Sequence, residues 1–151
     1  MQLLYGHDED VERFVSALVP GCSDGFGSSR CVGVIDGDGQ LVAGWAWHGW
    51  NPHAGTIEFS GASITPKWMT REILHKLFSY AFDGIGCQMI VTRNSDTNTR
   101  LHKQLKRYGF DRFDIPRLFG RDENGVVWTL TAEQWRAGSF YLGRGSDCVK
   151  T

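Results

Sequence analysis

Long apolar runs, an excess of basic charge and paired cysteines are all missing from this 151-residue sequence. No stretch approaches the about 20 apolar residues that a membrane-spanning helix needs, so we expect no membrane association. The formal net charge of -1 lacks the surplus of Lys and Arg typical of sequence-independent nucleic-acid binders, so nucleic acid is not expected as a partner. The first residues, MQLLYGHDEDVERF, turn acidic at once, unlike a secretory signal, and we expect a cytoplasmic protein.

The four cysteines are scattered along the chain, at Cys22, Cys31, Cys87 and Cys148. They form no CxxC pair and have no histidine at ligand spacing, so we predict no metal site. Without a secretion signal, reduced thiols are the default.

Hydrophobic periodicity indicates alternating strands and helices in one α/β domain. The predicted helices cover 7–20, 70–86 and 95–109, and the predicted strands cover 31–36, 40–50, 56–65, 87–94, 110–120 and 126–131. A helical crossover between Thr56 and Val91 requires parallel neighbouring strands, which makes the sheet mixed. A single domain is expected over 1–151. The stretch AEQW is expected to begin a polar tail, with 137–151 as the tail itself.

Three stretches carry a resemblance to a known family. In NTRLHKQLKRYGF, Asn98 opens a helix and Gly109 and Phe110 lead into a strand. Together with ITPKW and TREILHKLFSYAFDGIGCQMIV, this spacing resembles the GCN5-related N-acetyltransferases (GNAT), most of all the branch of ribosomal-protein acetyltransferases and their phage-encoded relatives. The likeness covers roughly 32–135. It implies a single GNAT-like domain: a mixed central sheet of about six strands, helices on both faces, and a splayed parallel strand pair that holds acetyl-CoA as acyl donor.

The junction SITPKWMTREIL corresponds to the family's phosphate-binding loop. Where the family has Gln/Arg-x-x-Gly-x-Gly/Ala, this chain has Lys67, Trp68, Met69, Thr70 and Arg71. A helix start offers free backbone N–H groups to a phosphate whatever its side chains, and Lys67 and Arg71 could add charge-assisted contacts. The alternative is that Thr70 only caps the helix and Arg71 is solvated.

The resemblance implies further cofactor contacts by the residues Ile64, Asn94, Asn98 and Arg100. Asn98 could equally be a plain helix cap. Arg100 lies in a basic helix side that could meet the 3′-phosphate of CoA, or simply be a solvated face.

Acetyl transfer requires a neutral amine and hence a proton acceptor. The resemblance places Glu58 on the strand that carries a general base in several family members; the alternative is a surface glutamate on a half-buried strand. His48 and His53, in WHGWNPH, could also take the proton, or be turn residues with satisfied hydrogen bonds. The positions of two familiar proton donors hold Leu105 and Leu101 instead.

Two functions follow from the resemblance. The first is acetyl transfer to a primary amine, either a protein α-amine or lysine or a small amine. The second, motivated by the missing donor and glycines, is a catalytically inactive module that binds CoA or a protein. A nucleic-acid binder using the basic stretch 93–121 is a third hypothesis, and a homodimer is open.

Overall fold

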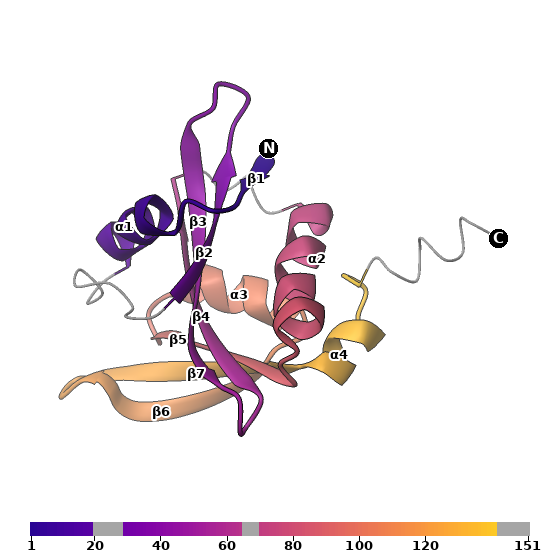
Figure 1. The fold of residues 1–151 in the computed structure, drawn as a ribbon. Helices are drawn as coiled ribbons and strands as arrows, with labels where there is room; N and C mark the ends of the chain where they lie inside the picture. Colours follow the sequence, from indigo (N-terminus) through magenta and orange to yellow (C-terminus); the bar gives the residue numbers. More distant parts are fainter. Residues whose placement is uncertain (20–28, 65–69, 142–151) are drawn as a thin grey trace.

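The computed structural model describes residues 1–19, 29–64 and 70–141. Seven strands form one mixed sheet in the order β1-β2-β3-β4-β5-β7-β6 (Figure 1). Their bounds are β1 Gln2–Leu4, β2 Ser29–Ile35, β3 Leu41–Asn51, β4 Thr56–Ser63, β5 Met89–Ser95, β6 Asp111–Gly120 and β7 Glu123–Thr131. The helices are α1 Asp8–Leu18, α2 Arg71–Ser79 with a π-helical extension Tyr80–Ile85, α3 Thr99–Arg107 and α4 Ala132–Ala137. The predicted α/β class and mixed sheet are confirmed.

The parallel pair β4–β5 separates shortly after it begins. The two strands pair at only three positions, the last being Glu58 opposite Val91. Beyond that point β4 stays paired with β3 as far as Ser63, while β5 stays paired with β7 as far as Ser95. Because each strand follows its other neighbour, a wedge opens between them, as predicted. We call it the splay.

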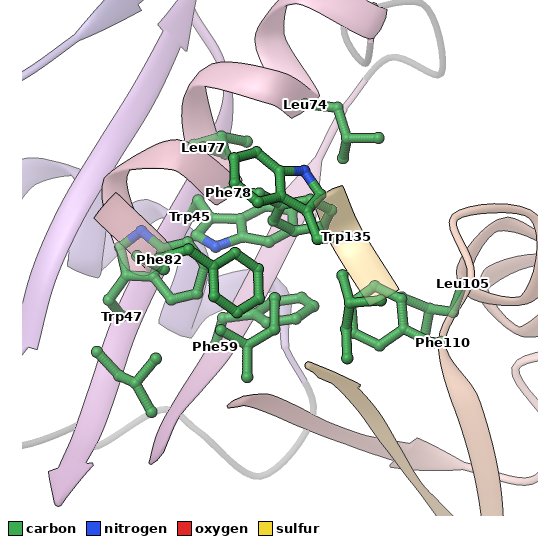
Figure 2. Packing of buried hydrophobic residues seen from close by; sticks show 14 of the residues in the cluster. Trp45, Trp47, Phe59, Leu74, Leu77, Phe78, Phe82, Leu105, Phe110 and Trp135 are labelled. Carbon is green, nitrogen blue, oxygen red and sulfur yellow. The ribbon is translucent and has the colours of Figure 1, made fainter. Parts of the chain in front are cut away.

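Helices cover the two faces of the sheet unequally. Figure 1 shows α1 on one side and α2 and α4 on the other. Alternate strand residues point towards α2, α3 and α4 and form the larger core cluster, which is rich in aromatic rings (Figure 2). Within it Trp45 stacks on Phe59 at 4.3 Å between ring centroids, and Phe110 contacts both Phe59 and Phe78 edge to face. Burial of each such ring stabilises the fold by about 1.5–3 kcal/mol.

The opposite face, towards α1, holds a smaller cluster that depends on two glycines. A Cβ atom at Gly44 would lie 2.6 Å from Val15 Cγ2, and one at Gly33 would lie 3.0 Å from Val11 Cγ2. Val11 and Val15 are fully buried there. Glycine on β2 and β3 therefore lets α1 sit directly on the backbone of the sheet.

The two ends of the chain differ from the sequence-based expectation. The three-residue β1 adds a seventh strand by pairing with β2. The stretch expected to begin a polar tail forms α4, with a capping box between Thr131 and Gln134 and with Trp135 buried. Phe140 is also buried, so the chain packs against the domain as far as 141, and 142–151 lie outside the described residues. Over the described ranges, no helix is long and apolar enough to cross a membrane.

Candidate functional site

The α1-side floor of the splay carries a cluster of polar side chains. Glu58 is the last residue of β4 that pairs with β5, and strand register places His48 of β3 directly opposite it. His48 Nδ1 lies 3.7 Å from Glu58 Oε2, and His48 Nε2 lies 3.0 Å from Ser60 Oγ. Arg93 of β5 donates to the other carboxylate oxygen of Glu58. Three strands thus bring His48, Glu58, Ser60 and Arg93 together, and we call them the polar cluster.

His48 is the less exposed partner in its contact with Glu58, with 16% of its side chain exposed against 29%. Burial lowers the pKa of His48 below its ordinary value of 6.5, Glu58 opposes that shift, and Arg93 adds to it. The imidazole is therefore neutral at pH 7 and can accept a proton. Arg93 is an opposite charge that holds the Glu58 carboxylate in one orientation.

On the face of β5 that belongs to the larger core cluster, opposite to the α1 side, Asn94 is the centre of a buried hydrogen-bond network. Its Oδ1 accepts from His102 Nε2 at 2.8 Å and from Trp128 Nε1 at 3.3 Å. An indole N–H can only donate, so the amide orientation is fixed with Oδ1 towards Trp128. The amide nitrogen Nδ2 is then buried without a hydrogen-bond partner among the described residues. A buried donor without an acceptor costs about 1–3 kcal/mol.

Across the opening of the splay, Thr92 of β5 donates its hydroxyl to the Phe59 carbonyl at 3.0 Å. This bond joins the two strands just beyond their last paired position, because backbone pairing stops at Glu58 and Val91. The wedge therefore begins after Thr92 in the direction of β5. Asn94 lies two residues further along this strand, on the same strand face.

The start of α2 is held by side chains that were expected to contact a cofactor. Thr70 Oγ1 accepts from Ile73 N at 3.2 Å and caps the helix. Arg71 donates to the Ser139 carbonyl at 2.8 Å, with its guanidinium carbon 4.5 Å from the centre of the Phe140 ring. The chain segment after α4 thus packs on the side chain expected to meet a pyrophosphate.

The remaining predicted cofactor residues fall into three situations. Ile64, the residue after β4, is exposed and donates its backbone N–H to Val42 O at 2.9 Å. Asn98 caps α3 by accepting from Leu101 N at 3.4 Å, and Arg100 is exposed on the same helix. Lys67, Trp68 and Met69 lie outside the described residues.

His53 does not join the polar cluster. It is exposed in the turn between β3 and β4, whereas the splay opens at the other end of β4. His48 and Glu58 are brought together, but the two histidines are not.

The positions of the two familiar proton donors are apolar in the structure as well. Leu105 is 2% exposed within the larger core cluster, and Leu101 packs against that cluster. Tyr108, three residues after Leu105, packs its ring on Phe140 at 5.1 Å, and burial raises its pKa. Leu105 and Leu101 therefore carry no proton that could pass to a thiolate, and the ring of Tyr108 packs within the domain.

Four residues of these networks are not predicted from the sequence: Ser60, Arg93, His102 and Trp128. Their only advance signal is strand alternation, which places Ser60 on the face of Glu58. Within the described residues no three His, Cys, Asp or Glu side chains gather as metal ligands would.

The chain is similar to known proteins in its three-dimensional structure, whereas sequence comparison gives no match. No family model matches the sequence, and no curated protein matches it. A spermidine N-acetyltransferase SpeG chimera from Vibrio cholerae and hSSAT is 14% identical with a TM-score of 0.73, covering 91% of this chain and 100% of that one. Spermidine/spermine N-acetyltransferase SpeG from Vibrio cholerae is 16% identical with a TM-score of 0.68, covering 95% of each chain. A GCN5-related N-acetyltransferase from Brucella melitensis is 18% identical with a TM-score of 0.63, covering 79% and 57%. The chain therefore has the GNAT fold.

Proposed function

We propose that this protein is an N-acetyltransferase that uses acetyl-CoA as acyl donor and a primary amine as acceptor. The carrying observation is that the two faces of the splay are equipped differently. The α1 side presents the polar cluster, with a carboxylate and a neutral imidazole. The opposite face, which packs against α2, α3 and α4, holds Asn94 with its amide nitrogen Nδ2 unpaired. The structural likeness to acetyltransferases supports this assignment. Closeness to the ribosomal-protein branch stays a prediction.

The residues present fit acetyl-CoA in one specific respect. The cofactor's pantetheine arm contains amide carbonyls, and Asn94 Nδ2 is a buried donor that lacks an acceptor. The unpaired edges of β4 and β5 beyond Glu58 and Val91 offer backbone donors and acceptors to the same arm. The start of α2 offers backbone N–H groups to the pyrophosphate. When bound, acetyl-CoA supplies a thioester carbon for attack and a thiol as leaving group.

The polar cluster prepares the acceptor. A protonated amine cannot attack, so a proton must leave it first. In the proposed mechanism Glu58 takes this proton, directly or through one water, while Arg93 keeps the carboxylate aimed. His48 is neutral at pH 7 and provides a second place for the proton, 3.7 Å from Glu58 Oε2. Leu105 and Leu101 have no proton to donate, so the proton that the leaving thiol requires would come from water.

The acceptor class stays broad, and a protein amine or a small amine would both suit a carboxylate base. The SpeG proteins act on spermidine, a polyamine. Here the one carboxylate of the polar cluster is already paired with Arg93, which favours an acceptor with a single reacting amine over a polycation.

A second candidate is a CoA-binding or protein-interaction module on the same fold without turnover. Two observations favour it: the apolar side chains at Leu105 and Leu101, and the use of Arg71 by the segment after α4. It predicts cofactor affinity without product.

Calorimetric titration with acetyl-CoA and with free CoA, followed by mass analysis of a mixed-amine reaction, separates the candidates. Micromolar acetyl-CoA binding with an acetylated amine supports the enzyme. Micromolar binding without product supports the module. No binding at millimolar ligand contradicts both, and protein partners would then be the next target.

A further inference from the structure

The outermost strand of the sheet, β6, is open to solvent on both faces and along one edge. It pairs only with β7 and ends the strand order. Every residue from Asp111 to Arg117 is exposed, including Phe113 at 53% and Ile115 at 38%. Figure 1 shows β6 at the margin of the sheet, with no helix or strand of the described chain beyond it. A free strand edge that carries large apolar side chains is a template for pairing with another chain.

Only the second half of β6 is protected against such pairing. Its register with β7 breaks between Ile115 and Gly120, the stretch that contains Pro116 and Arg117 with φ 64°. A bulge and a proline both interrupt an edge. From Asp111 to Ile115, in contrast, the register with β7 is unbroken. Five regular residues are therefore free to pair.

The charges of this free stretch select a second copy of the same strand as its partner. Arg112 and Asp114 lie two residues apart on one face and are paired within the chain, with Arg112 Nη2 2.8 Å from Asp114 Oδ1. In an antiparallel arrangement with its two-fold axis at Phe113, Arg112 of each copy faces Asp114 of the other. Directly opposite side chains are close enough that opposite charges stabilise and like charges destabilise the pair.

Neighbouring registers are disfavoured by the same rule. Side chains that share a face require shifts of two residues, which move the axis to position 112 or to position 114. The first places Arg112 opposite Arg112, and the second places Asp114 opposite Asp114. Only the axis at Phe113 gives two attractive pairs, and it also sets the two Phe113 rings side by side.

We propose that the protein dimerises by antiparallel pairing of β6 with β6 of a second copy about Phe113, which joins the two sheets into one. A contact of about five residues on each side lies at the small end of specific interfaces, so the dimer is weak and concentration-dependent. The proposal does not depend on the catalytic assignment.

Sedimentation velocity over a concentration series, with a charge-swap set, tests this pairing. Arg112→Asp alone and Asp114→Arg alone each turn both pairs into like-charge pairs, and each should weaken dimerisation by about tenfold or more. An equimolar mixture of the two variants restores both attractive pairs across the interface but neither within a chain, so heterodimers should form. Wild type that stays monomeric at high concentration, single variants that dimerise like wild type, or a mixture that stays monomeric would each overturn the proposal.

A disulfide trap tests the register separately. Antiparallel partners lie about 4.5–5.5 Å apart between Cα atoms, within disulfide range, so Phe113→Cys should give a covalent dimer under mild oxidation. Phe119→Cys, beyond the register break, is the matched control, and wild type measures background from the native cysteines. Equal trapping at both positions would contradict the register.

Discussion

Replacing Asn94 with leucine separates a structural from a ligand-binding role for the buried amide. Asn94 Oδ1 accepts from His102 and Trp128, whereas Nδ2 has no partner among the described residues. Leucine has a similar shape and removes both functions at once. If Nδ2 donates to a cofactor carbonyl, acetyl-CoA affinity must fall while the fold persists.

The expected magnitudes follow from the contacts. His102 Nε2 keeps a second acceptor, Ser95 O at 3.0 Å, but Trp128 Nε1 loses its acceptor, at a cost of about 1–3 kcal/mol. Removing the unpaired Nδ2 returns a similar amount, so the unfolding free energy should change by less than about 2 kcal/mol. One lost neutral hydrogen bond to the ligand, worth about 0.5–1.5 kcal/mol, weakens acetyl-CoA binding about two- to twelvefold.

Urea denaturation and calorimetric titration of the same preparations measure the two quantities. Trp128→Phe is the matched control, because it removes one donor to Asn94 Oδ1 and leaves Nδ2 in place. It should lower stability without changing acetyl-CoA affinity. Equal affinity in wild type and folded Asn94→Leu would refute the donor role of Nδ2.

Two further predictions concern His48 and Gly44. Because burial lowers the pKa of His48 in the folded protein, the unfolded chain binds protons first as pH falls below 6.5, so the unfolding free energy decreases there. His48→Gln should therefore flatten the dependence of the unfolding free energy on pH between 7 and 5. The slope that remains includes His75, whose pKa burial also lowers. An unchanged slope would show that His48 is not buried as a neutral group. Gly44→Ala places a methyl group 2.6 Å from Val15 Cγ2 and should destabilise the protein by about 1–3 kcal/mol in thermal unfolding, whereas Gly37→Ala, at an open turn, should change it far less. Equal effects would show that α1 does not rest on the sheet as described.

Much of the fold could be predicted from local pattern. Alternation identified β4, helical spacing identified α2 and α3, and Thr70 and Asn98 cap these two helices. The misses have local causes. Three residues are too few for β1 to show a period, and α4 contains enough charged residues to resemble a tail although its Trp135 is buried.

The candidate site could be predicted less well from the sequence, because it depends on register between strands that are distant in the sequence. His48 faces Glu58 across the β3–β4 pair, and Arg93 reaches Glu58 across the short parallel pair. His53 has the same side chain as His48 but lies in the turn, where no register brings it to the splay. The network around Asn94 depends on Trp128 of β7, which no local motif indicates. The catalytic roles of Glu58 and His48 stay predictions.

The most direct test of the proposed function compares wild type with Glu58→Gln in acetyl transfer to a mixture of peptide and small-molecule amines, with the acetylated product measured by mass spectrometry. Glutamine keeps the shape of Glu58 but cannot take a proton at neutral pH. We predict an amine-dependent product in wild type, a rate about 10²–10⁴-fold lower in Glu58→Gln, and the same acetyl-CoA affinity in both. Equal rates in the two proteins, or no product from wild type that binds acetyl-CoA, would contradict the account.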